Sequence, residues 1–118
     1  MGYLITGEGN LEIKRALVNV AASQTDSNIV SAVTGKKIRV VSVAMVTAAT
    51  ATNVTFNTKP SGSGVAISPL FANAANGGAV LPLNPAGWFE TSSAEGLTVT
   101  TGAGSTTGIL VNYVESAV

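Results

Sequence analysis

The chain has 118 residues, carries no net charge, and contains neither cysteine nor histidine. These absences exclude disulfides, thiolate chemistry and any catalysis that needs a histidine base. Zero net charge also leaves no electrostatic signature of nucleic-acid or anionic-membrane binding. Charged residues make up only 10% of the chain, against roughly 25% in an average domain, so we expect a neutral surface that associates readily.

The N-terminal residues predict an arm followed by a single domain. Residues 1–10 contain Gly2, Gly7 and Gly9 and little that could pack, so we expect an extended arm that is mobile until a partner binds it. A β-sandwich domain is expected over residues 11–118. No apolar run approaches the roughly 20 residues of a membrane span, and no basic segment precedes an apolar core, so no signal peptide is expected.

The segment after the arm allows two interpretations. Residues 11–22 contain Leu, Glu, Lys, Arg and Ala, which favour a helix. The sequence Val18-Asn19-Val20-Ala21 favours a strand instead. We predict a strand over residues 16–22, then a turn, and then a short strand over residues 28–33.

Residues 36–47 form the longest apolar run and predict a central strand. One phase of its alternation comprises Ile38, Val40, Ala44 and Val46. The opposite phase comprises Val41, Val43 and Met45. Because both phases are apolar, we expect the second to be covered by a short segment or by a neighbouring subunit. Val41, Val43 and Met45 are therefore candidate interface residues.

The remainder of the chain alternates between short strands and turns. Further strands are predicted over residues 52–58, 65–68, 79–83, 88–92, 97–101 and 107–115. Turn residues separate them at short intervals, which is typical of an all-β sandwich or barrel. The expected core residues are Ile38, Val40, Val54, Phe56, Leu97, Val99, Val111 and Tyr113.

No catalytic, metal or cofactor site is predicted, and we expect no enzyme activity. Glu90 and Glu95 flank one turn, so they could approach each other as the two carboxylates of a glycosidase must. Charges exposed to solvent beside a loop are the favoured interpretation. The segment 102–108 is rich in glycine, but its glycine spacing does not match a dinucleotide fingerprint and it does not open a helix.

Trp88 is the only tryptophan. It could stack on a sugar ring, anchor an interface, or lie in the core or at its rim beside Phe89. Tryptophan is enriched at the centres of interfaces, so Trp88 and Phe89 join the candidate interface residues.

Three parts of the chain together resemble small phage head proteins of the jelly-roll decoration, or cement, type. They are residues 26–42 with Gly35-Lys36-Lys37-Ile38-Arg39-Val40, residues 72–91 with Asn76-Gly77-Gly78 and Gly87-Trp88-Phe89-Glu90-Thr91, and residues 95–113 with Gly108-Ile109-Leu110-Val111-Asn112-Tyr113. The resemblance covers roughly residues 16–115 and carries no catalytic signature.

The resemblance implies a single-domain, eight-stranded jelly-roll-like sandwich that forms a homotrimer. It further implies a structural virion protein that is made in the host cytoplasm, binds the phage major capsid protein and stabilises the capsid from outside. The same fold also serves receptor- or carbohydrate-binding modules of tail fibres and spikes, which is the alternative function.

Overall fold

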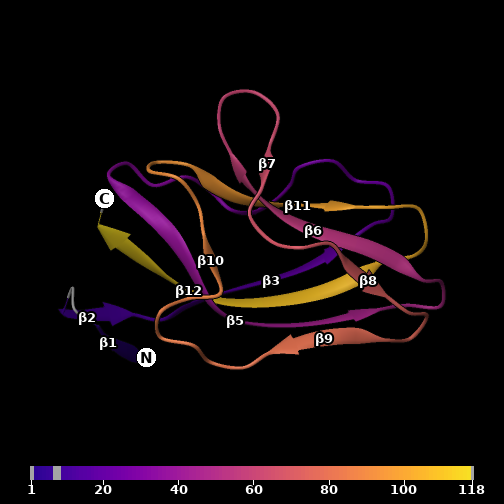
Figure 1. The fold of residues 1–118 in the computed structure, drawn as a ribbon, viewed down its shortest axis with the longest axis horizontal. Helices are drawn as coiled ribbons and strands as arrows, with labels where there is room; N and C mark the ends of the chain where they lie inside the picture. The colour runs from indigo at the N-terminus through magenta and orange to yellow at the C-terminus, as the bar shows by residue number, and fades with distance from the viewer. Residues whose placement is uncertain (1, 7–8, 118) are drawn as a thin grey trace.

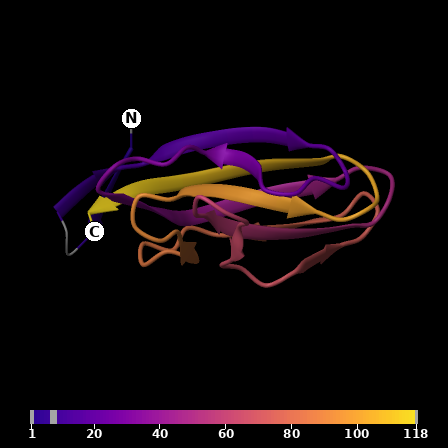
Figure 2. The same cartoon turned by 90° about the horizontal axis from the view of Figure 1, so that it is seen from above.

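The computed structural model describes residues 2–6 and 9–117, and this part of the chain contains strands and loops but no helix. The strands form two antiparallel sheets of five strands each and one separate two-stranded sheet (Figure 1). Figure 1 shows most strands of one large sheet above those of the other, and the two sheets overlap when seen from above (Figure 2), so they pack face to face as a sandwich. The predicted all-β sandwich is therefore confirmed, and the helix considered for residues 11–22 is not formed.

The first sheet, called sheet I, is built around the long apolar strand β5 (Lys36–Thr47). β5 pairs along nearly its whole length with β12 (Thr107–Ala117), and β3 (Lys14–Val20) pairs with the other side of β12. On its opposite side β5 pairs with the short strands β9 (Gly78–Leu81) and β10 (Phe89–Glu90). β3 is consequently one edge of sheet I.

The second sheet, called sheet II, has β11 (Gly96–Thr101) between β4 (Ser27–Val30) and β6 (Thr52–Lys59). Two short strands, β7 (Val65–Ala66) and β8 (Phe71–Asn73), pair with the far side of β6. Apolar residues alternate with threonine and asparagine along β6 and β11, so one face of sheet II can be buried while the other stays polar.

The predicted arm contains a hairpin. β1 (Tyr3–Thr6) pairs with β2 (Gly9–Glu12) in the separate two-stranded sheet, which lies at one end of the sandwich (Figure 1). The expected domain boundary after residue 10 therefore falls inside a strand. Residues 1, 7 and 8 of the predicted arm lie outside the described residues, and the mobility of the arm stays a prediction.

Sheets I and II contain five strands each, so the expected total of eight strands is wrong. Strand β8 was not predicted, because Phe71–Asn73 is too short to show an alternating pattern. Strand β10 is confined to Phe89–Glu90, within the longer strand predicted over residues 88–92. Tertiary pairing, rather than local sequence, sets the ends of such short strands.

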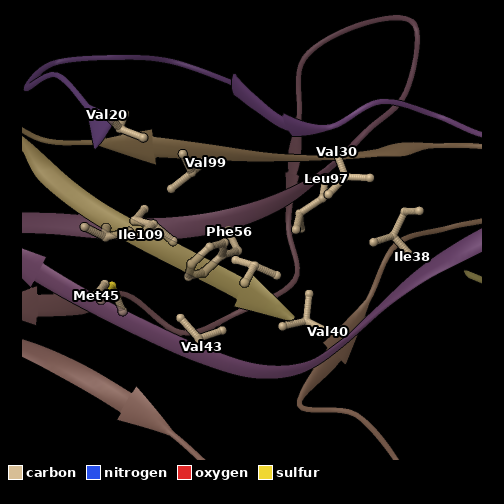
Figure 3. Packing of buried hydrophobic residues seen from close by; sticks show 12 residues of the cluster. Val20, Val30, Ile38, Val40, Val43, Met45, Phe56, Leu97, Val99 and Ile109 are labelled. Atoms are coloured by element: carbon tan, nitrogen blue, oxygen red, sulfur yellow. The ribbon is translucent and has the colours of Figure 1, made fainter. Parts of the chain in front are cut away.

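The core lies between the two sheets. Its buried residues include Phe56 at the centre, with Val40, Ile109, Leu97 and Val99 around it (Figure 3). Seven of the eight expected core residues are fully buried: Ile38, Val40, Val54, Phe56, Leu97, Val99 and Val111. The eighth, Tyr113, is only partly buried and packs against the edge of this cluster. Its hydroxyl explains that position, because a buried hydroxyl needs a hydrogen-bond partner.

Candidate functional site

A β-bulge in strand β5 decides which residues face out of sheet I. Asn112 pairs with Ser42 and the next residue, Tyr113, pairs with Val40, so Val41 is an extra residue without a partner in the register. Such an insertion shifts the alternation of side chains by one residue. Val40 and Val43 consequently point to the same face.

The bulge corrects the two phases assigned to this strand. Beyond Val41, the core face carries Val43 and Met45, whereas Ala44 and Val46 are exposed. The sequence pattern placed Ala44 and Val46 on the same face as Ile38, and that assignment is wrong. The sequence could not reveal the bulge, because the extra residue, Val41, is a valine and leaves the apolar run of this strand unbroken.

Three of the candidate interface residues are buried within the protomer. Val43 and Met45 are each 2% exposed and belong to the main core (Figure 3). Val41 is fully buried on the opposite face, where it packs with Val114 beneath Leu11 and Ile13. Residues of this phase were expected to be covered by a short segment or a neighbouring subunit, and Val41 is covered by a short segment of the same chain. These residues therefore present no surface to a partner of the folded protomer.

A different set of apolar side chains lies exposed on the outer face of sheet I. The β-sheet register places Leu17 opposite Leu110, Leu110 opposite Ala44, and Ala44 opposite Val80. These four residues, called the apolar row, run straight across strands β3, β12, β5 and β9. Leu17 is 75% exposed and Val80 is 73% exposed. The row is thus a continuous apolar stripe that no segment of the described chain covers.

The apolar row borders a shallow depression. Gly108 stands between Asn19 and Val46 in the register, and having no side chain it leaves a hollow of about 180 Å³. Leu17, Leu110, Val46 and Val80 are among the residues that line it. A volume of this order accepts one aliphatic or aromatic side chain.

Polar residues flank the apolar row on its other side. Asn112 donates a hydrogen bond from Nδ2 to Oγ of Ser42 at 2.8 Å, and its Oδ1 accepts one from Nε of Arg15 at 3.4 Å. The outer face of sheet I therefore has an apolar centre beside polar groups that already bond one another. Polar groups that already bond one another cost less free energy to bury than unpaired ones when a partner displaces water from them.

Trp88 and Phe89, the other two candidate interface residues, point in different directions. Phe89 turns into the core and stacks on Phe56, with ring centroids 5.1 Å apart. Trp88 is 42% exposed, and its Nε1 donates a hydrogen bond of 2.7 Å to the carbonyl oxygen of Pro82. Trp88 therefore remains available to a partner, with its ring held in place, while Phe89 stabilises the sandwich.

The two carboxylates considered for glycoside hydrolysis are held by separate partners. Glu90 faces the basic side chains of Arg39, at 3.4 Å, and Lys37, at 3.8 Å. Glu95 accepts a hydrogen bond of 2.6 Å from the hydroxyl of Thr58. Glu90 thus links β10 to β5, and Glu95 links the turn before β11 to β6.

Asp26 has a structural role that its sequence position did not reveal. Its Oδ2 accepts a hydrogen bond from the backbone N–H of Gly64 at 3.0 Å, and its Oδ1 accepts from Asn57 and Thr98, each at 3.3 Å. A side chain at residue 64 would collide with this carboxylate. Gly64 therefore allows the 60–64 loop to be fastened to sheet II through Asp26.

Lys14 and Tyr113, paired across β3 and β12, both have a raised pKa. The pKa of Lys14 is raised by its 3.1 Å hydrogen bond to Glu115 and by the charge of that carboxylate. Partial burial, and then the same negative charge, raises the pKa of Tyr113. Lys14 also lines an open groove of about 840 Å³ between the base of the hairpin and sheet I.

Among the described residues, no group of three or more acidic side chains is placed to hold a metal ion. The same part of the chain has no helix of the length and apolarity needed to cross a membrane. Comparisons of this chain with protein-family models, with curated proteins and with solved structures give no match.

Proposed function

We propose that this protein is a structural virion protein: a capsid decoration, or cement, protein with a jelly-roll type of sandwich. In this role it is made in the host cytoplasm, forms a homotrimer and binds the major capsid protein on the outside of a phage capsid. The support from sequence is the resemblance of the strand and turn segments over roughly residues 16–115.

The observation that carries the proposal is the exposed apolar row on an all-β sandwich. Contiguous exposed apolar surface on a protein in water is a mark of an interaction site. A cement protein acts by burying surface across the junctions between capsid subunits, and each Å² of apolar surface removed from water contributes about 25 cal/mol. Such a role needs no covalent chemistry, cofactor or metal.

Co-sedimentation with capsids tests this proposal. Purified protein is mixed with capsids of the phage that encodes it, prepared without this protein, and both the bound copies and the temperature of capsid disruption are measured. We expect saturable binding and a higher disruption temperature. Capsids that bind no protein and break at an unchanged temperature would contradict the proposal.

A second candidate, a carbohydrate- or receptor-binding module of a tail fibre or spike, is favoured by Trp88. Its ring is partly exposed and fixed by the hydrogen bond to Pro82, and exposed aromatic rings can stack on sugars. A glycan array separates the two functions. Selective sugar binding that is lost in Trp88→Ala would favour the binding module, whereas the cement function predicts no selective sugar binding.

A further inference from the structure

We propose that the apolar row and the depression over Gly108 are the surface through which copies of this chain bind one another. The occupant of this surface is thus a second copy of the chain. This inference rests on the self-association in the proposed function and assigns it to named residues. It does not depend on capsid binding.

The shape of the face favours a copy of itself. Leu17 and Val80 project from the two ends of the apolar row, each more than 70% exposed, while the hollow over Gly108 lies between the strands that carry them. A projecting side chain and a hollow that accepts one therefore occur on a single face. Such a pair is self-complementary, because the projection of one copy can fill the hollow of the next.

The charge distribution of the face removes the usual obstacle to self-association. The outward positions of the three rows are Arg15, Asn112 and Ser42, then Leu17, Leu110, Ala44 and Val80, then Asn19, Gly108, Val46 and Gly78. Arg15 is the one charged residue among them, and it lies at the rim with a hydrogen bond to Asn112. Two copies can therefore meet without bringing like charges together at the centre.

The size of the face suits the centre of such an interface. Four strands about 4.8 Å apart, with three outward rows about 7 Å apart, cover on the order of 400 Å² in projection. Stable complexes bury about 800 Å² per partner, with an apolar core and a polar rim. Projecting side chains make the accessible area larger than the projection, and the adjoining edge strand β3 and its loops can supply the rim.

Elsewhere on the outer face of sheet I, apolar side chains are covered by another segment of the chain. Val41 and Val114 are fully buried there because Leu11 and Ile13 cover them. On β12 the apolar row lies at Leu110, two outward-facing residues from Val114, and it has no such cover. We infer that another copy covers the apolar row, as Leu11 and Ile13 cover Val41.

Light scattering coupled to size exclusion, at several micromolar concentrations, tests the assignment with three variants. Leu17→Lys and Val80→Lys place a charge at the two ends of the apolar row, and Gly108→Ala adds a methyl group to the hollow, where the backbone needs no glycine and the nearest atom is 3.1 Å away at the end of Asn19. We expect the parent to have a multiple of the 11.8 kDa protomer mass. Each variant should weaken the association by at least tenfold.

Matched controls are Leu70→Lys and Val65→Lys, which change residues of similar exposure on the side of sheet II. They should keep the mass of the parent. Circular dichroism confirms that each variant is folded, and Gly108→Ala serves if a lysine variant does not fold.

Each outcome decides the inference. A parent that stays monomeric overturns it together with the self-association. An oligomer that persists in Leu17→Lys and Gly108→Ala overturns the assignment of the surface alone, and so does an oligomer that the control variants break equally. An oligomer lost only in the variants of the face supports the inference, whether or not the protein binds capsids.

Discussion

At the scale of single residues, Phe56 shows how a side chain on the core face of a strand stabilises the sandwich. Its side chain is fully buried, stacks on Phe89 at 5.1 Å, and meets Phe71 edge to face at 6.1 Å. The three rings come from strands β6, β10 and β8, so they join both sheets of the sandwich. Aromatic pairs of this kind contribute about 0.5–1.5 kcal/mol beyond the area that they bury.

We predict that Phe56→Ala lowers the free energy of unfolding by about 3–5 kcal/mol, because it leaves a cavity between the two sheets. Urea unfolding followed by circular dichroism measures the loss. Val65→Ala is the control, since Val65 is 57% exposed and should lose little. If Phe56→Ala unfolds at the same urea concentration as the parent, Phe56 does not anchor the core.

The raised pKa values of Lys14 and Tyr113 give a pH dependence at the alkaline end. Both groups hold their protons more tightly when folded than at their ordinary pKa values of 10.5 and 10.0. Their contribution to stability is therefore fully present below these values and is lost as the pH rises through the higher pKa of the folded state.

Thermal unfolding of the parent should therefore shift to lower temperature between about pH 9 and about pH 11. Part of this shift should disappear in Tyr113→Phe, which lacks the ionising hydroxyl. Tyr3→Phe is the matched control, because Tyr3 is 63% exposed, and it should keep the full shift. Equal shifts in the parent and in Tyr113→Phe would remove Tyr113 from this explanation.

At the scale of elements, the hairpin β1–β2 has two separable parts. Its strands pair only with each other, so they add no strand to the sandwich. The residues at its base, Leu11 and Ile13, cover Val41 and Val114 on the outer face of sheet I. The pairing part and the covering part should therefore affect stability differently.

We predict that a variant lacking residues 1–10 keeps a cooperatively folded sandwich but binds capsids more weakly, as expected if this segment reaches the partner. Ile13→Ser should instead lower the free energy of unfolding by about 1–3 kcal/mol, because it uncovers buried valines. Urea unfolding and co-sedimentation measure the two effects. Unchanged capsid binding after the deletion would remove the hairpin from the mechanism.

At the scale of the whole molecule, the chain combines zero net charge with an uncovered apolar row. A net charge would keep copies apart in solution, and this chain has none. Three copies in a closed ring are what the resemblance to decoration proteins implies, whereas a self-complementary face pairs two copies, so the measured mass decides between a trimer and a dimer.

Self-association should make thermal stability depend on concentration, because a partner that binds only the folded protomer stabilises it by mass action. We predict that the melting temperature of the parent rises as the protein concentration is raised a hundredfold. Leu17→Lys should show a smaller rise, and Leu70→Lys should match the parent. Differential scanning calorimetry measures all three, and a melting temperature independent of concentration in the parent would contradict the prediction.

The sequence by itself determined the all-β class and most of the core. Period-two alternation at Val54 and Phe56, and at Leu97 and Val99, left those residues only one buried face, and all four are buried. The bounds of the central strand, Lys36–Thr47, were also predicted correctly, because an apolar β-branched run without Gly or Pro has few other conformations available.

Only the tertiary structure decided which side chains of the central strand face outward. The bulge at Val41 arises from pairing with β12, a strand about 70 residues further along the chain, and a local alternation of valines carries no trace of it. The bulge buries Val43 and Met45 and exposes Ala44 and Val46. The apolar row likewise exists only across four strands in register, since each strand contributes a single residue to it.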